Sequence, residues 1–340
     1  MRNAPTKLML ALLASAVMTA DAYAQASYPC VNDAPNPYKL ATNWAQTPRT
    51  FGPTNAVTVD SKDNIWVFDR CGDMGCSGSK LSPIYELSPA GKTMKNIGAG
   101  QFVSAHGIAV DKDGNVWAAD FQAKDGKGMQ VVKLSPDGKV LLKVGKAGEA
   151  GMGDDAFNAP TGVAVLSTGE VLVAEGHGSK LNKSRVNVYD KSGKFLRSFA
   201  KHGTGEGELT EPHAIAVDKQ DHIYVADRTG ARVNIYDKTG KFLASWKQFG
   251  RPSGVWVDNN DMIYVADSQS AADPKEANYN GGCKMGIRVG SVKDGKVLYY
   301  IPPPPAADPK TPPPEGIAVD SKGNIYAAAV QGKDVKKYTK

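Results

Sequence analysis

The sequence has little of several features that identify common protein classes. Its 340 residues include 4 cysteines, 5 histidines and 8% aromatic residues, and the formal net charge is only +6. This charge is too mild and too evenly spread to predict nucleic-acid binding. No stretch shows sustained helical periodicity, and there is neither a nucleophile-elbow serine motif nor a phosphate-binding glycine loop. The function must therefore be sought in a local site.

One long apolar run is present, Leu8–Ala20, and it lies at the N-terminus. It is preceded by Arg2 and Lys7 and followed by small residues at Ala22 and Ala24, as in a secretory signal. The run is too short, and wrongly flanked, for a membrane anchor. We predict a signal peptide over residues 1–24, a mature chain over residues 25–340, and a periplasmic or secreted protein.

The cysteines agree with export, because an even number in an oxidising compartment suits disulfides. All four lie in the predicted mature chain: Cys30, Cys71, Cys76 and Cys283. Four cysteines allow three different sets of disulfide pairs, and the sequence does not choose among them. Cys71–Cys76 is the local candidate, and it would leave Cys30–Cys283 to tie the N-terminal segment to a late loop. A thiolate zinc site is less favoured, because no second Cys-x-x-Cys-like pair completes it.

An internal repeat predicts the fold. A fifteen-residue pattern recurs six times at spacings of 40 to 62 residues, over Asn55–Asp69, His106–Asp120, Thr161–Glu175, His213–Asp227, Ser253–Asp267 and Glu315–Ala329. Each unit is an apolar strand, a polar turn and a second apolar strand, and a second hairpin follows most units. Four strands per repeat indicate an all-β, six-bladed β-propeller filling residues 25–340. The segment near Tyr38–Trp44 is expected to supply the last strand and close the ring.

The strand order also predicts which end carries a site. The long insertions all follow the second strand of a repeat, so they gather around one mouth of the channel. The first position of each repeat should point to the axis at that mouth: Asn55, His106, Thr161, His213, Ser253 and Glu315. By chance, about 0.1 histidine would fall in six such positions, and two are found.

His106, His213 and Glu315 come from alternate blades, so they can close on one divalent metal ion. Two imidazoles and a carboxylate suit zinc with an open position, or a non-haem iron. The alternative is a polar channel lining without a metal.

Two further residues are assigned to the same rim. Arg70 follows the second strand of blade one and could hold a substrate carboxylate, or instead form a salt bridge with Asp69 or Asp73. His177 follows the second strand of blade three and could transfer protons, or be a solvated loop histidine. The other histidines are expected in a surface loop (His202) and at the opposite end (His222).

The repeats resemble NHL repeats, and the chain is similar to six-bladed lyases of the peptidyl-α-hydroxyglycine α-amidating family. The motifs that carry this are AHGIAVD at His106, EPHAIAVD with VADR at His213, and VFDR at Arg70. The resemblance implies cleavage of a carbinolamide, with an axial zinc held by three histidines. The third histidine falls at Glu315 here, and the catalytic tyrosine falls at His177. Gly316 replaces an acidic residue that helps to hold a structural calcium ion, so calcium is not expected.

Three function classes follow. The first is a metal-dependent lyase-like enzyme for a small hydroxylated or carboxylate-bearing substrate, with His177 taking a proton and Arg70 stabilising negative charge. The second is a metal-dependent hydrolase such as a lactonase, for which Asn55 and Glu315 are the fitting residues. The third is a non-catalytic binding module. We expect a small-molecule substrate as partner, no nucleic acid, no membrane span, and a monomer.

Overall fold

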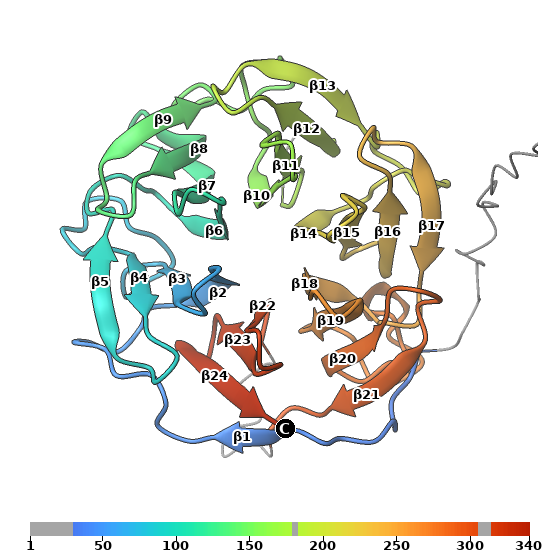
Figure 1. Cartoon of the computed structure of the whole chain (residues 1–340). Coiled ribbons are helices and arrows are strands. Elements are labelled where there is room, and N and C mark those ends of the chain that lie inside the picture. Colours follow the sequence, from blue (N-terminus) through green and yellow to red (C-terminus); the bar gives the residue numbers. More distant parts are fainter. Residues whose placement is uncertain (1–29, 179–182, 305–313) are drawn as a thin grey trace, which may run out of the picture.

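The structure, a computed structural model, describes residues 30–178, 183–304 and 314–340. Six four-stranded antiparallel sheets stand around a central channel, which confirms the six-bladed β-propeller (Figure 1). Besides strands, the described residues form one short 3-10 helix, Ala277–Tyr279. No helix among the described residues is long and apolar enough to cross a membrane. The predicted signal segment, residues 1–24, lies outside the described residues.

Each blade runs from an inner strand at the channel to an outer strand at the perimeter. The first three blades consist of β2 (Thr54–Val59), β3 (Ile65–Asp69), β4 (Ile84–Leu87) and β5 (Thr93–Ile97); β6 (Ala105–Val110), β7 (Val116–Lys124), β8 (Lys127–Leu134) and β9 (Val140–Val144); and β10 (Pro160–Val165), β11 (Val171–Glu175), β12 (Arg185–Tyr189) and β13 (Phe195–Phe199). The last three consist of β14 (Pro212–Val217), β15 (Ile223–Asp227), β16 (Arg232–Tyr236) and β17 (Phe242–Trp246); β18 (Pro252–Val257), β19 (Met262–Asp267), β20 (Gly286–Ser291) and β21 (Val297–Ile301); and β22 (Gly316–Val319), β23 (Ile325–Ala329), β24 (Asp334–Thr339) and β1 (Lys39–Ala41).

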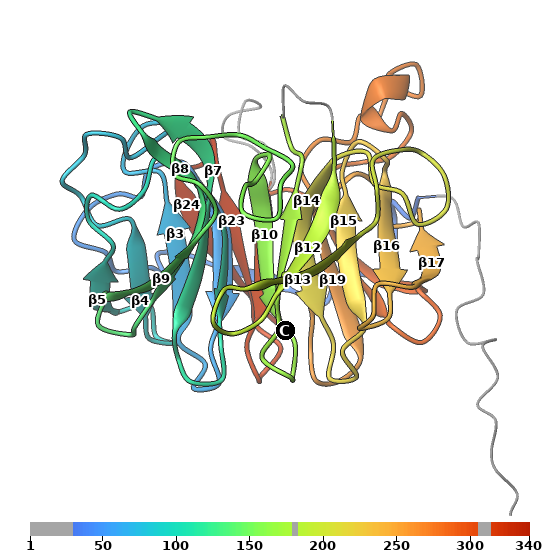
Figure 2. The same ribbon diagram turned by 90° about the horizontal axis from the view of Figure 1, so that it is seen from above.

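The long connections gather at one end of the ring and the short turns at the other (Figure 2). We call the end with the long connections the mouth. The insertion after the second strand of blade two, Phe121–Met129, is not an irregular loop: it extends the β7–β8 hairpin, with Ala123 opposite Gly128 and Lys124 opposite Lys127. An insertion whose two arms continue an existing antiparallel pair keeps its backbone hydrogen bonds, and this favours a longer hairpin over an irregular loop.

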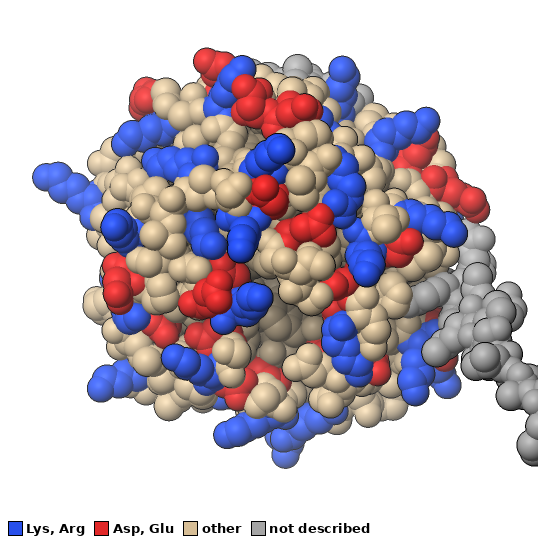
Figure 3. All heavy atoms as spheres, turned by 45° about the horizontal axis from the view of Figure 1, so that its top comes forward, with Lys and Arg blue, Asp and Glu red and all other residues tan. Residues whose placement is uncertain are grey.

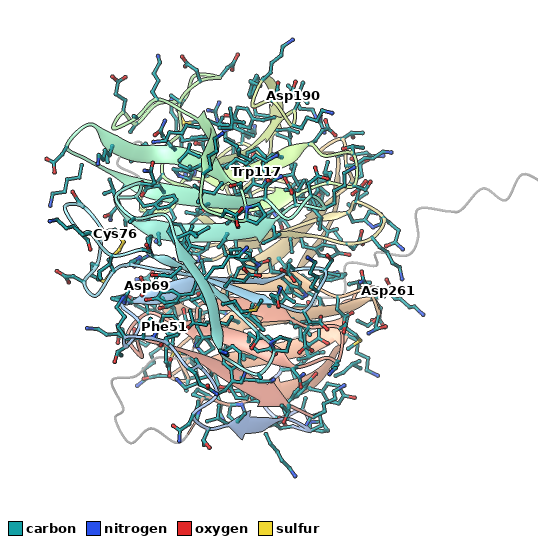
Figure 4. All side chains as sticks on the ribbon, turned by 60° about the vertical axis from the view of Figure 1, so that its left-hand side comes forward. Phe51, Asp69, Cys76, Trp117, Asp190 and Asp261 are labelled. Atoms are coloured by element: carbon teal, nitrogen blue, oxygen red, sulfur yellow. A yellow bond between two sulfur atoms is a disulfide. The ribbon has the colours of Figure 1, made fainter. Side chains whose placement is uncertain are left out.

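The core lies between the blades. Six clusters of buried apolar side chains each join the facing surfaces of two neighbouring sheets. Trp66, Trp117 and Trp246 are almost fully buried in these layers, and Trp117 is labelled in Figure 4. Outer strands such as β9 bury alternate residues only, so they face solvent on one side. The packing thus fixes the angle of each blade around the channel.

The ring is closed by residues 30–51, which we call the N-terminal strap. Its strand β1 pairs with β24, with Lys39 opposite Thr339, as the sequence predicts. Both expected disulfides are present: Cys30–Cys283 ties the strap to blade five, and Cys71–Cys76 lies at the mouth end of blade one, beside the Cys76 label in Figure 4. Two disulfides fit a protein of an oxidising compartment.

A buried acid occupies the last position of the fifteen-residue repeat in five of the six blades, where the second strand ends in every case except β7, which continues to Lys124. We call these residues the strand-end acids: Asp69, Asp120, Glu175, Asp227 and Asp267. Each accepts backbone N–H groups from the segment that enters the inner strand of its own blade, as Asp227 does from Thr210 and Glu211. Four of them also pair with an arginine, while Asp120 has no such pair among the described residues. These carboxylates fix the backbone that leads to the channel.

Glycine follows the axial residue in four blades because the inner strands approach closely there. A Cβ atom on Gly107 would stand 2.4 Å from the carbonyl oxygen of Thr161. A Cβ atom on Gly316 would stand 2.4 Å from the carbonyl oxygen of Asn55. The ring is therefore tightest at the level of the axial residues, and position 316 cannot take a side chain without a shift of its neighbour.

Candidate metal centre at the channel mouth

The channel is lined by the six inner strands and encloses a cavity of about 200 Å³. All six first positions of the repeats line it, as predicted: Asn55, His106, Thr161, His213, Ser253 and Glu315. They form a ring at the level where the inner strands begin. The prediction that the first position of each repeat faces the channel is therefore confirmed.

His106 and His213 are each 3% exposed and face one another, with ring centres 4.6 Å apart. The Nδ1 of His106 donates to the carbonyl of Thr161 (2.9 Å), and that of His213 donates to the carbonyl of Ser253 (2.7 Å). Carbonyl oxygens only accept, so Nδ1 carries the proton and Nε2 is left as an acceptor. Neither Nε2 has a hydrogen-bond partner among the described residues. Two buried, unpaired nitrogens thus point to a missing ligand.

Electrostatics agree with neutral imidazoles. Burial, and then the charges of His177 and Arg70, hold the pKa of His106 well below its usual value. Burial, and then the charge of Arg228, does the same for the pKa of His213. A neutral imidazole is the form that binds a metal ion.

The axial residues of the intervening blades are satisfied by protein atoms. The single hydroxyl proton of Thr161 faces two carbonyl oxygens, those of Pro212 (2.9 Å) and Ala174 (3.1 Å). The hydroxyls of Ser253 and Ser268 lie 2.7 Å apart. Asn55, with its amide turned to suit both neighbours, donates to Ala105 and accepts from Arg70. The unpaired axial groups therefore alternate with paired ones around the ring.

His177 lies closer to these histidines than a solvated loop residue would. It follows β11, is buried except for 19% of its side chain, and has its ring centre 5.3 Å from His106 and 4.8 Å from His213. One nitrogen from each of the three rings lies within 4.8 Å of the others. Its Nδ1 is 2.5 Å from Glu211 Oε1. These three histidines could hold a metal ion.

Glu315 lies near His213 in the channel. Its Oε2 is 3.8 Å from His213 Nε2, and its Oε1 is 3.9 Å from Arg228 Nη1. These separations are too long for hydrogen bonds. The Glu315 carboxylate thus lies at ion-pair distance from His213 and Arg228 without a hydrogen bond to either, and 18% of its side chain is exposed.

Arg70 is buried against the axial ring. Its Nε donates to the carbonyl of Ala105 (3.0 Å), and its guanidinium lies 5.3 Å from the centre of the Phe121 ring. Burial lowers the pKa of Arg70, and the charge of Glu315 opposes that effect. The expected alternative, a salt bridge to Asp69, is not formed among the described residues, because Asp69 pairs with Arg49.

Sequence reasoning missed four residues of the mouth: Phe121, Glu211, Arg228 and Arg251. Arg228 follows Asp227 as Arg70 follows Asp69, so the repeated strand-end sequences VFDR and VADR could have revealed it. Its Nη2 lies 3.0 Å from Nδ1 and 3.4 Å from Nε2 of His177. Phe121 occupies the same position in blade two and stacks with His177 at 6.0 Å. No sequence signal marked Glu211.

Glu211 connects the loop histidine to the arginines. It accepts from His177 and from the Thr229 hydroxyl, and its Oε1 is 3.4 Å from Arg228 Nη2. Burial alone would raise the pKa of Glu211, but the His177 hydrogen bond and the Arg228 charge outweigh it and hold the pKa well below its usual range. Burial and the Arg228 charge lower the pKa of Arg251, whose Nη2 also contacts Thr229.

The remaining histidines lie where predicted. His222 pairs through Nδ1 with Asp218 (2.9 Å) in a tight turn at the end opposite the mouth. His202 lies in the connection before β14, with its Nδ1 3.3 Å from the hydroxyl of Ser184.

On the face shown in Figure 3, acidic and basic side chains are intermixed.

Comparison with known families gives the same fold. A family model (DUF5128) described as a 6-bladed β-propeller matches residues 179–281. Among solved structures, the virginiamycin B lyase of Staphylococcus aureus superposes with a TM-score of 0.57 at 15% identity, over 89% of this chain and 99% of that one. At this identity the likeness shows the fold alone.

Curated relatives align over about half of the chain. The peptidylglycine α-amidating monooxygenase of Rattus norvegicus is 32% identical over 202 residues, which are 52% of this chain and 20% of that protein. The peptidyl-α-hydroxyglycine α-amidating lyase 2 of Drosophila melanogaster is 29% identical over 207 residues, which are 56% of this chain and 48% of that protein. The aligned part thus spans less than half the length of each relative.

Proposed function

We propose that this chain, a six-bladed β-propeller homologous to peptidyl-α-hydroxyglycine α-amidating lyases over about half its length, is a metal-dependent lyase-like enzyme. Its substrate is a small hydroxylated or carboxylate-bearing molecule bound at the mouth. The observation that carries the proposal is the pair of buried Nε2 atoms, on His106 and His213, that have no partner among the described residues. The homology to named lyases supports the reaction class.

The donor set fits a divalent ion. His106 and His213 would hold it, and either Glu315, as the sequence predicts, or His177 would complete the set. Such sites suit zinc, with iron as the second choice. The ion, when bound, supplies Lewis-acid polarisation of a hydroxyl or water oxygen.

The arginines of the mouth would bind the substrate. Arg70, Arg228 and Arg251 face two carboxylates, Glu211 and Glu315, so three positive charges minus two negative ones leave +1 with neutral histidines. A divalent ion would raise this to +3. Such a surplus in a partly buried site favours an anionic substrate, and a guanidinium can bind a carboxylate bidentately. Arg70 and Arg228 flank the histidines, so they would orient that carboxylate beside the reacting carbon.

The remaining sequence predictions complete the proposal. The chain would be exported with cleavage after Ala24, leaving one propeller domain over residues 25–340. The paired cysteines support an oxidising destination.

Elemental analysis of the purified protein tests the metal. We expect about one equivalent of zinc or iron in the parent protein, and its loss in His106→Ala combined with His213→Ala. A parent protein that binds no divalent ion would refute the proposed function. A metal-containing protein in which both substitutions leave the metal in place would refute this site.

Product analysis tests the reaction. A peptidyl-α-hydroxyglycine should give an amide and glyoxylate, and simple lactones should remain intact. Hydrolysis of lactones without lyase turnover would favour a lactonase instead. Metal-free binding of a macromolecular partner, without turnover of either substrate, would favour a binding module.

A further inference from the structure

The geometry points to His177 as the third protein ligand of the metal centre, positioned by Glu211, with Glu315 outside the ligand set. This inference rests on the proposed function, because it presupposes an ion at His106 and His213. It reverses the expectation from ring symmetry, which assigned the ligand role to Glu315 in blade six. It concerns residues that come from a loop and not from an inner strand.

The first argument is distance. The described residues contain one group of three ligand atoms that lie within 4.8 Å of one another, and it consists of His106, His177 and His213. Ligands about 2.0–2.1 Å from a tetrahedral zinc ion stand roughly 3.5 Å apart, so small side-chain movements suffice. Glu315 approaches His213 to 3.8 Å but is not in a group of this kind with both histidines.

The second argument is the common orientation of the three rings. In each, Nδ1 meets an oxygen acceptor: Thr161 for His106, Ser253 for His213, and Glu211 for His177. Metal-binding histidines usually donate their second ring N–H to a carbonyl or carboxylate, which fixes the tautomer and the ring angle. Glu211 accepts at both oxygens, from His177 and from Thr229, so it acts as a carboxylate and Nδ1 of His177 carries the proton. The Nε2 of His177 then carries the lone pair that an ion needs, and Arg228 Nη2, which lies 3.4 Å from it, must turn toward Glu211 when the ion binds.

The third argument is that Glu211 is itself held in place. Its backbone N–H donates to the strand-end acid Asp227 (2.7 Å), and its backbone oxygen accepts from Arg228 N (2.9 Å). The Thr229 hydroxyl donates to its Oε2. The rings of His106, His213 and Phe121 surround His177, and the fixed carboxylate adds the hydrogen bond that orients its Nδ1 away from the axis. Glu211 is thus a positioning residue and not a ligand.

The assignment changes the charge of the centre. Three neutral imidazoles leave the ion with its full double charge, whereas a Glu315 ligand would reduce it by one. A higher charge makes a stronger Lewis acid and lowers the pKa of a bound water further. Glu315 then remains beside Arg228 at the mouth.

The test measures metal affinity and not activity. Zn²⁺ affinity is determined by competition with a chromophoric chelator, and Co²⁺ is substituted to read ligand number and type from its visible absorption bands. His177→Gln should lower Zn²⁺ affinity strongly and shift the Co²⁺ bands. Glu211→Gln should lower affinity about 10- to 100-fold with the same ligand number. Glu315→Gln should leave both nearly unchanged.

Matched variants control for indirect effects. His222→Gln removes another histidine paired with a carboxylate, at the opposite end. Glu208→Gln removes an acid of the same connection that pairs with Lys201 on the surface. Both should retain the parent affinity, and thermal unfolding of the metal-free proteins checks that all variants fold. Thr229→Val, which frees one oxygen of Glu211, should weaken Zn²⁺ binding less than Glu211→Gln.

The outcomes separate this inference from the proposed function. If Glu315→Gln loses the metal while His177→Gln keeps it, Glu315 is the third ligand and the inference is wrong, although the metal centre stands. If Glu211→Gln and Glu208→Gln bind Zn²⁺ alike, Glu211 has no positioning role and that part fails. If the parent protein binds neither ion, the proposed function itself fails.

Discussion

The two ends of the propeller are built from the same repeat, yet they differ in how their polar groups are satisfied. At the end opposite the mouth, an aspartate opens the turn in five blades: Asp60, Asp111, Asp218, Asp258 and Asp320. Each accepts backbone N–H groups of its turn and a tryptophan or tyrosine of the next strand. At the mouth, the Nε atoms of Arg228 and Arg251 and the Nε2 atoms of two histidines have no partner among the described residues.

The histidine–carboxylate pairs make the same contrast. His222 and Asp218 lie four residues apart in one turn, and the aspartate also serves that turn. His177 and Glu211 come from different blades, and the histidine faces two further imidazoles. A polar group that recurs in five of the six blades and is satisfied within its own turn stabilises the fold. One that breaks the repeat and is left unpaired indicates function.

The largest effect should come from a mouth arginine. Arg70→Gln should lower turnover about 10²- to 10³-fold, because a charged donor near the reacting atoms is lost, while the metal is retained. Kinetics and elemental analysis on the same preparation measure this. Arg232→Gln, at an arginine that pairs with buried Asp227, is the control and should reduce stability instead. Full turnover in Arg70→Gln would show that the mouth arginine is structural too.

A turn aspartate should affect stability alone. Asp111 accepts the backbone N–H groups of Asp113 and Asn115 and the indole N–H of Trp117. Asp111→Ala leaves these donors unpaired, so the free energy of unfolding should fall by about 2–4 kcal/mol. Denaturant titration measures this, and metal content per folded molecule should not change. A loss of metal in this variant would break the contrast between the two ends.

Asp120 predicts a pH dependence. Burial raises its pKa to about 7, against the opposing hydrogen bonds from Ser104 and Val103. The native state therefore keeps a proton that the unfolded state releases near pH 4, so stability should fall as the pH rises from about 4 to 7 and then level off. In Asp120→Asn, the slope of the free energy of unfolding against pH should be smaller by up to about 1.4 kcal/mol per pH unit. Denaturant titrations between pH 5 and 8 measure it.

Asp113→Asn, in an exposed turn, is the control for Asp120→Asn and should retain the parent slope. If Asp120→Asn shows that slope too, another group is responsible for it.

The smallest effect is expected at His222. His222→Gln removes a partly exposed pair with Asp218, which should cost less than about 1 kcal/mol. Zn²⁺ affinity and turnover should stay at the parent values. A larger loss, measured by denaturant titration, would mean that this pair is as important as its counterpart at the mouth.

The fold was predictable because its signals are repeated. Six copies of one hairpin set the strand order, and the phase of the repeat placed His106 and His213 on the axis. The position of a residue within the repeat is thus enough to predict that it lies at the channel axis. The ring closure by β1 was predictable for a similar reason, since one blade lacked an outer strand.

The rest of the site depends on loops, and loop geometry is not periodic. The distance of His177 from the axis depends on how the chain after β11 turns, and no pattern in the sequence reports that. Glu211 was invisible for the same reason, since its partner comes from another blade. Arg228 is different: its strand-end position matched that of Arg70, and comparing the repeats position by position would have found it.

The N-terminal strap also has a consequence for the order of folding. Cys30 and Cys283 are separated by 253 residues, and β1 pairs with β24. The contacts of the strap therefore form only after the later blades have folded. Contacts so distant in sequence form slowly, because a very large loop must close first. Blades two and four can each fold earlier, but their histidines reach a common axis only when the circle is complete. Metal binding should therefore be a late folding event. It follows ring closure and shows that all six blades have assembled.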